Sequence, residues 1–156
     1  MARSIEHLPE CIAQIKRHEG LRLEAYRCPV GVLTIGWGHN CDASPIDRVQ
    51  KVGDVISLGT AEVLLSADMA LVANEIDRRL PWWRELDAPR QAVLLNMGFQ
   101  LGVSGLCKFA KMLHSVEAGD WNEAGRQMLD SKWATQTRSR AAELSTQMVL
   151  GTWQEG

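Results

Sequence analysis

The sequence predicts an α+β fold in which a small, hairpin-containing N-terminal lobe is joined by one long helix to an all-helical C-terminal lobe. Three observations lead to this prediction. Residues 33–38 alternate with the period of a β-strand that has one buried face. Residues 60–80 have the apolar spacing of a long helix. After Pro81, every apolar pattern is helical.

The chain is expected to form a single domain over residues 1–156. Its lobes cover about 1–59 and 81–156, and the helix at about 60–80 links them. A chain of 156 residues, 46% hydrophobic and 23% charged, is long enough to bury a core. Two lobes of this kind leave a cleft between them, where binding sites commonly lie.

The first expected element is a helix from about Ser4 to His18. Ser4 is a plausible N-cap, and apolar residues follow at helical spacing: Leu8, Cys11, Ile12 and Ile15. Gly20 comes just after the expected end of this helix. Glu19 should therefore lie near the helix C-terminus.

A β-hairpin is expected from about Tyr26 to His39. One face of its second strand should be buried and carry Leu33, Ile35 and Trp37, and the other should carry Thr34, Gly36 and Gly38. The glycines allow another group to approach the backbone closely. Such a hairpin suits a cleft that admits a polymer.

A loop-rich connection is expected over 40–59, because this segment holds turn formers and little periodicity. A long helix then begins with Thr60 as N-cap and with Glu62 in its first turn, where the helix dipole favours a negative charge. Its apolar stripe is predicted to consist of Val63, Leu64, Ala67, Ala70 and Leu71, and its end is marked by Arg78, Arg79 and Pro81.

Four helices are expected in the C-terminal lobe. Asp87 is a candidate N-cap of a buried helix that holds Val93, Leu94, Leu95 and Met97. Two shorter helices follow, at about Phe109 to Glu117 and about Asp120 to Leu129. A last helix, about Arg138 to Leu150, ends at Gly151.

Composition argues against several classes of partner. The net charge is −2 and no block of like charge occurs, so nothing indicates nucleic acid binding. No segment approaches the roughly 18–20 apolar residues of a membrane span, and the N-terminus lacks the apolar region of a signal peptide. The four cysteines show neither a CxxC pair nor metal-ligand spacing with histidine. We therefore expect reduced thiols, and the sequence implies neither a metal nor an organic cofactor.

Three side chains form a candidate catalytic group. Glu19, at the end of a helix, should face the thiol of Cys28 and the hydroxyl of Thr34 on the hairpin. A carboxyl can donate a proton, whereas a hydroxyl can both donate a hydrogen bond to a water molecule and accept one from it. Where a second carboxylate would be convenient, the chain has Cys28.

Two sets of motifs resemble the phage-type lysozymes of glycoside hydrolase family 24, in particular those of T-even phages. The N-terminal set is EGLRL at 19–23, AY at 25–26 and TIGWGH at 34–39. The C-terminal set is LNMGFQLG at 95–102, SKW at 131–133, QT at 136–137, RA at 140–141 and GTW at 151–153. The resemblance covers nearly the whole chain and implies a lysozyme-like fold.

The resemblance implies hydrolysis of the β-1,4 bond between N-acetylmuramic acid and N-acetylglucosamine in peptidoglycan. The family's Glu–Asp–Thr pattern falls here on Glu19, Cys28 and Thr34. A branch of the family has a similar Cys-Pro-x-Gly-Val-x-Thr run. Three roles stay open for Cys28: positioning or deprotonating a water molecule, acting as a covalent nucleophile, or packing as a small apolar residue.

The resemblance also implies supporting residues. Arg140 matches an arginine that pairs with the catalytic acid, and His39 and Asp68 match an ion pair between the hairpin lobe and the long helix. The saccharide cleft would be lined by Asn40, Phe99, Met112 and Gln127. Gln100 and Trp133 would support the cleft from the helical lobe.

The resemblance implies a monomeric endolysin that acts on peptidoglycan glycan strands. It would stay in the host cytoplasm until a holin opens the membrane, and then reach the periplasm and cell wall. One alternative is a catalytically silent peptidoglycan-binding protein, because Cys28 replaces a carboxylate. Another is a lytic transglycosylase or a chitin-directed glycosidase on the same fold.

Overall fold

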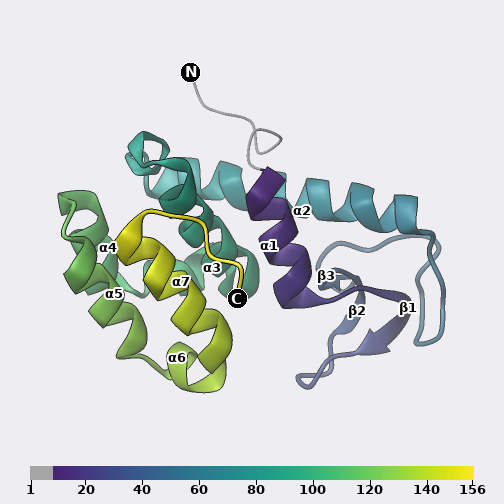
Figure 1. The fold of residues 1–156 in the computed structure, drawn as a ribbon. Coiled ribbons are helices and arrows are strands. Elements are labelled where there is room, and N and C mark those ends of the chain that lie inside the picture. Colours follow the sequence, from purple (N-terminus) through teal and green to yellow (C-terminus); the bar gives the residue numbers. More distant parts are fainter. Residues whose placement is uncertain (1–8) are drawn as a thin grey trace. The chain divides into compact units, whose positions relative to one another are not determined.

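The computed structural model describes residues 9–156 (Figure 1). In this part of the chain, seven α-helices accompany one three-stranded antiparallel sheet, which confirms the α+β prediction. The chain forms two compact units. We call residues 15–71 the hairpin unit, and residues 9–14 with 72–156 the helical unit.

Helix α1, Pro9–Glu19, contributes residues to both units. Cys11 and Ile15 are buried as predicted, and the chain turns at Gly20, whose φ is 69°. Glu19 is therefore the last helical residue, close to the expected position. The predicted cap Ser4 and the predicted core residue Leu8 lie outside the described residues.

The sheet of the hairpin unit has the order β1-β2-β3, formed by Arg22–Arg27, Leu33–Gly36 and His39–Asn40. Its register shifts between Arg22 and Tyr26, so β1 contains a bulge. The prediction that β2 has one buried face is wrong, because all four of its residues are buried. Side chains from outside the sheet cover the second face: Gly36 lies against Ala61 and Ile56.

Helix α2, Leu58–Arg79, begins earlier than predicted. The Oγ of Ser57 accepts a hydrogen bond from the backbone N–H of Thr60 at 3.1 Å, so Ser57 provides the cap that was assigned to Thr60. The predicted apolar stripe is also wrong: Val63 is 67% exposed and Leu71 is 61% exposed. The buried residues lie on the opposite side of the helix, namely Ala61, Leu65, Met69, Ala73 and Ile76.

The helical unit is built around α3, Ala88–Cys107, whose predicted core residues Val93, Leu94, Leu95 and Met97 are all buried. The side chain of Asp87 accepts from the N–H of Arg90, as expected of an N-cap. The helix is interrupted at Gly102, where φ is 73° and ψ is 154°.

The remaining helices follow the prediction closely. They are α4 Ala110–Ala118, α5 Trp121–Leu129 and α7 Arg138–Leu150, and α7 ends at Gly151 in the left-handed conformation. Two short elements were not predicted, the 3₁₀ turn Trp83–Glu85 and helix α6, Lys132–Gln136. Within residues 9–156 no single helix is long and apolar enough to cross a membrane, and the one helix pair that reaches that length, α3 with α4, is bent by 104°.

Candidate active site

Glu19 lies against the turn between β2 and β3. A Cβ atom added to Gly38 would stand 3.5 Å from the Oε2 atom of Glu19 and 3.6 Å from its carboxyl carbon. Gly38 has a φ of 75°, a conformation that residues with a side chain rarely adopt. A side chain at position 38 would therefore be in van der Waals contact with the carboxyl group, and the positive φ is the reason that this position favours glycine.

Cys28 begins the tight loop between β1 and β2. Its N–H donates to the carbonyl of Val32 at 3.0 Å, and the N–H of Gly31 donates back to the Cys28 carbonyl at 2.8 Å. Gly31 has a φ of 84°, as expected in a three-residue hairpin loop that ends in a left-handed residue. Arg27 donates to the Gly31 carbonyl at 3.0 Å and ties down the same loop.

The loop presents hydrogen-bond donors to the half-exposed Cys28 sulfur. The backbone N–H of Val32 is the main cause that lowers the pKa of this thiol, and the N–H of Val30 and the hydroxyl of Thr34 add to the effect. Burial, which would raise this pKa, is outweighed. The arrangement favours a thiolate that can accept a proton or orient a water molecule.

Thr34 is only 6% exposed, and its Oγ1 donates to the carbonyl of Val32 at 2.9 Å. The same hydroxyl is placed to hydrogen-bond the Cys28 sulfur. One hydroxyl hydrogen serves one acceptor at a time, so ionisation of the thiol would draw it from Val32 to the sulfur. The structure thus brings together two of the three predicted catalytic residues, while Glu19 lies at Gly38 in the same unit.

The predicted pair of His39 and Asp68 is present within the hairpin unit. The Nδ1 atom of His39 lies 2.8 Å from Asp68 Oδ2, and its Nε2 atom lies 2.8 Å from the carbonyl oxygen of Ser44. The hydrogen bond to Asp68 is the main cause that raises the pKa of His39, with burial opposing it. This pair joins β3 to α2.

Asn40, a predicted saccharide ligand, shapes the loop after β3. Its Oδ1 accepts the backbone N–H groups of Asp42 at 3.0 Å and Ala43 at 2.9 Å. This is the pattern of an Asx turn. The side-chain oxygen thus has a structural use in the loop.

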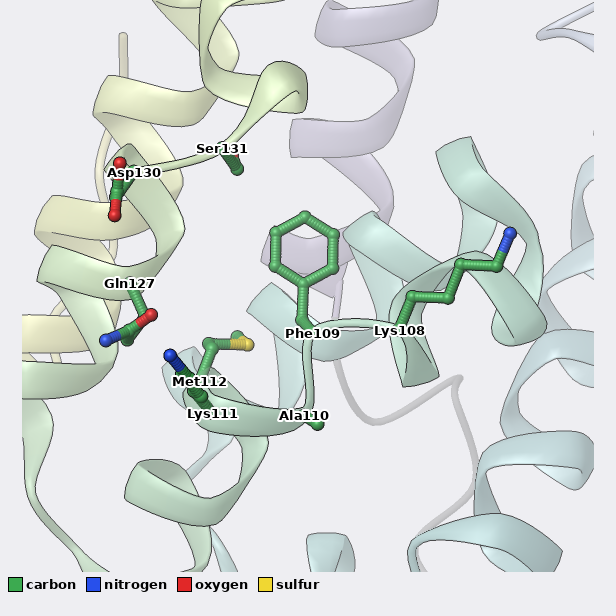
Figure 2. Close-up of a pocket in the computed structure, with 8 residues that line it drawn as sticks. All are labelled: Lys108, Phe109, Ala110, Lys111, Met112, Gln127, Asp130 and Ser131. Carbon is green, nitrogen blue, oxygen red and sulfur yellow. The ribbon is translucent and has the colours of Figure 1, made fainter.

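The helical unit contains a pocket of about 400 Å³ where α4 faces the end of α5. Figure 2 shows its eight lining residues: Lys108, Phe109, Ala110, Lys111, Met112, Gln127, Asp130 and Ser131. Met112 and Gln127 were predicted as substrate-binding residues and do meet here, whereas Phe99, which is half-buried, is not among them. Phe109 was predicted only as the start of a helix, although Lys108 and Lys111 lie on either side of this aromatic residue.

Gln100 and Trp133 support the pocket through Phe109, one of its lining residues. The indole N–H of Trp133 donates to Gln100 Oε1 at 2.8 Å, and the rings of Trp133 and Phe109 meet edge to face with centroids 5.9 Å apart. Arg140, which was predicted to support the catalytic acid, contacts Asn96 on α3. It donates from Nε to the Oδ1 atom of Asn96 at 2.8 Å. The pairing of Arg140 with Glu19 stays a prediction. Among residues 9–156, no three His, Cys, Asp or Glu side chains are grouped as metal ligands would be.

Comparison with known proteins agrees with these observations. The family model for phage lysozyme matches residues 16–147. The probable T4-type lysozyme 2 of Dictyostelium discoideum is 30% identical over 90% of this chain and 94% of its own length. An endolysin of Acyrthosiphon pisum secondary endosymbiont phage 1 is 29% identical over 77% of this chain and 74% of its own length.

A third relative is much longer. The pre-baseplate central spike protein Gp5 of Enterobacteria phage T4 is 32% identical over 88% of this chain. The chain spans only 27% of the length of that protein.

Proposed function

This chain belongs to the phage lysozyme family of glycoside hydrolases, and we propose that it is a muramidase that hydrolyses the β-1,4 bond between N-acetylmuramic acid and N-acetylglucosamine in peptidoglycan. The observation that carries the proposal is that the thiol of Cys28, in the same unit as Glu19, lies in a loop whose N–H groups, together with the Thr34 hydroxyl, lower its pKa. This thiol supplies a basic group where the family pattern has a carboxylate.

In the proposed reaction, Glu19 gives its proton to the glycosidic oxygen as the bond to the anomeric carbon breaks. A water molecule oriented by Thr34 and Cys28 attacks that carbon from the opposite face of the sugar. The Cys28 thiolate takes one proton from this water and then releases it to solvent, while Glu19 regains a proton from solvent, so both groups return to their starting states. Direct attack by water inverts the anomeric configuration.

Four variants test these roles. Glu19→Gln removes the proton donor and should lower the rate of peptidoglycan lysis by at least about 100-fold. Cys28→Ala and Cys28→Ser should lower it by about ten-fold or more, because neither side chain provides a base. Cys28→Asp should retain or raise activity, because it restores an oxygen base that is ionised at neutral pH.

The pH dependence adds a second measurement. Activity that needs the thiolate rises as pH increases through the thiol pKa, and Cys28→Asp should move this rise to lower pH because a carboxylic acid ionises earlier. Full activity in Cys28→Ala would assign Cys28 to packing. A glycosyl group covalently attached to Cys28, found by mass spectrometry of trapped enzyme, would assign it as the nucleophile.

Product analysis separates this proposal from the other activities of the fold. Hydrolysis leaves a reducing N-acetylmuramic acid end, whereas a 1,6-anhydromuramic end would identify a transglycosylase. Co-sedimentation with peptidoglycan sacculi without release of fragments would identify a silent binding protein. Cleavage of chitin but not of peptidoglycan would identify a chitin-directed glycosidase.

The proposed setting is lysis of the bacterial host by a monomeric endolysin that a holin releases from the cytoplasm. The relative named as an endolysin supports it, and the four free cysteines suit a reducing compartment. The spike protein supports a second candidate, in which the same activity works as part of a phage particle. Detection of the chain in purified virions would favour the spike role, and its restriction to the lysate would favour the endolysin.

A further inference from the structure

We infer that Lys16 and Trp37 are positioning residues for Glu19, holding the turn at Gly38 that lies beside its carboxyl group. This inference deepens the proposed muramidase function and rests on it. Neither residue would touch the substrate's reacting atoms. Their effect would act through the position of the proton donor.

Lys16 joins three elements of the hairpin unit. It lies three residues before Glu19 in α1, so the two side chains share one side of the helix. Its Nζ atom lies 4.5 Å from the ring centroid of Trp37, in the turn after β2, and 2.7 Å from Glu62 Oε1 on α2. The ammonium group thus fixes the last turn of α1 against both the hairpin and α2.

Trp37 connects the Lys16 contact to Gly38, the residue beside the Glu19 carboxyl group. It is only 7% exposed and directly precedes Gly38. His39, on the other side of Gly38, is held by Asp68 and by the carbonyl of Ser44. Gly38 is therefore held on both sides, by Trp37 through Lys16 and by His39 through α2.

Loss of the Lys16 contact frees one side of this turn. Proton transfer to a glycosidic oxygen requires the acid within hydrogen-bond reach, and a displacement of about 1 Å can cost roughly 100-fold in rate. A change in the position of the turn should affect the chemical step more than binding of the glycan. The consequence is a fall in kcat with little change in KM.

The primary variant is Lys16→Met, which keeps the length and the apolar stem but removes the charge. On soluble peptidoglycan oligomers, kcat should fall about ten-fold with KM within about two-fold of the parent, and Lys16→Arg should restore most of the loss because it keeps the cation. Trp37→Phe, with a smaller aromatic face, should give an intermediate kcat.

The helical unit offers a closely matched control. Arg84 also pairs with a carboxylate, Asp77 at 2.8 Å, and also lies 4.5 Å above an indole ring, that of Trp83. Arg84→Met removes the same two kinds of interaction, but from the helical unit, whereas Glu19 belongs to the hairpin unit. It should lower the free energy of unfolding by an amount similar to Lys16→Met and leave kcat unchanged.

A spectroscopic measurement tests the contact without catalysis. In ¹H–¹⁵N spectra of the parent protein, Glu19→Gln should shift the amide resonance of Gly38, because the carboxyl group lies close to this residue. In the Lys16→Met background the same substitution should shift it by less than half as much. If the parent protein proves inactive, the proposed function fails, while this measurement still decides whether Lys16 keeps Glu19 beside the turn.

Two results would overturn the inference. One is a kcat of Lys16→Met equal to that of the parent, or reduced no more than in Arg84→Met. The other is an unchanged response of the Gly38 amide to Glu19→Gln when Lys16 is replaced.

Discussion

At the level of single residues, Cys28 shows how a loop conformation can lower the pKa of a thiol. An ordinary cysteine is mostly protonated at neutral pH. Here the N–H of Val32 is the main cause that lowers the pKa of the thiol, and the N–H of Val30 and the hydroxyl of Thr34 add to the effect. By contrast, burial raises the pKa of Cys11 to about 12, which leaves that thiol inert. The difference between the two cysteines comes from their surroundings in the fold.

The pair of His39 and Asp68 should make stability depend on pH. Because the folded-state pKa of His39 is raised, the pair stabilises the fold fully below the unfolded value of about 6.5. The contribution is lost as pH rises through the folded-state pKa. Asp68→Asn should therefore cost on the order of 1–3 kcal/mol near pH 6 and clearly less near pH 9. Urea unfolding of both proteins across this range measures the difference.

Asp77→Asn is the control for this prediction. Asp77 pairs with Arg84. Because arginine side chains in general do not titrate between pH 6 and pH 9, the loss of stability in Asp77→Asn should not vary over this range. The loss of unfolding free energy in Asp68→Asn could instead stay constant or grow as pH rises. That result would show that the contact with Asp68 does not stabilise a positive charge on His39.

At the level of elements, the start of α2 gives a direct test of capping. Ser57 Oγ accepts from the Thr60 N–H at 3.1 Å and lies 3.0 Å from Thr60 Oγ1, to which it donates. Ser57→Ala should lower the free energy of unfolding by about 1 kcal/mol, and Ser57→Asp should preserve it because aspartate also caps. Thr60→Ala should cost less than Ser57→Ala. If denaturant unfolding shows a larger loss of stability for Thr60→Ala than for Ser57→Ala, then Thr60 is the N-cap.

Helix ends were predicted better than helix faces. Asp87 and Gly151 mark helix ends by local chemistry, and α7 has the predicted bounds. The buried side of α2 depends instead on what packs against it, and this helix has apolar residues on both sides. Helix α6, with five residues, is too short to show a helical period. Burial of the second face of β2 was not predicted either, because it also depends on the residues that pack against it.

The sequence predicted which residues form the candidate site, but not which groups surround them. The sequence motifs alone indicate Glu19, Cys28 and Thr34 as catalytic candidates. The position of Glu19 beside Gly38 depends on a glycine in the left-handed conformation. The lowered pKa of Cys28 depends on hydrogen bonding in a tight loop. Neither feature leaves a periodic signal in a sequence. Phe109 lines the helical unit's pocket because helix α4 starts beside the end of α5, and one sequence does not reveal such pairings.

At the level of the whole molecule, the net charge of −2 bears on how the protein finds its substrate. A strongly basic protein is drawn to an anionic cell wall over about a Debye length, and salt weakens this attraction. This chain lacks the net charge for such steering. Lysis of outer-membrane-permeabilised cells should therefore change by less than about three-fold between about 10 mM and 150 mM ionic strength.

A charge-reversed variant shows whether the assay can detect steering at all. Glu117 and Glu155 are exposed, and replacing both with lysine reverses the sign of the net charge. This variant should lyse cells faster than the parent at low salt and lose that advantage at physiological salt. A ten-fold fall in the parent's own activity over the same range would mean that a local basic surface captures the wall in spite of the net charge. Lys108 and Lys111 at the pocket of the helical unit would then be the first residues to replace.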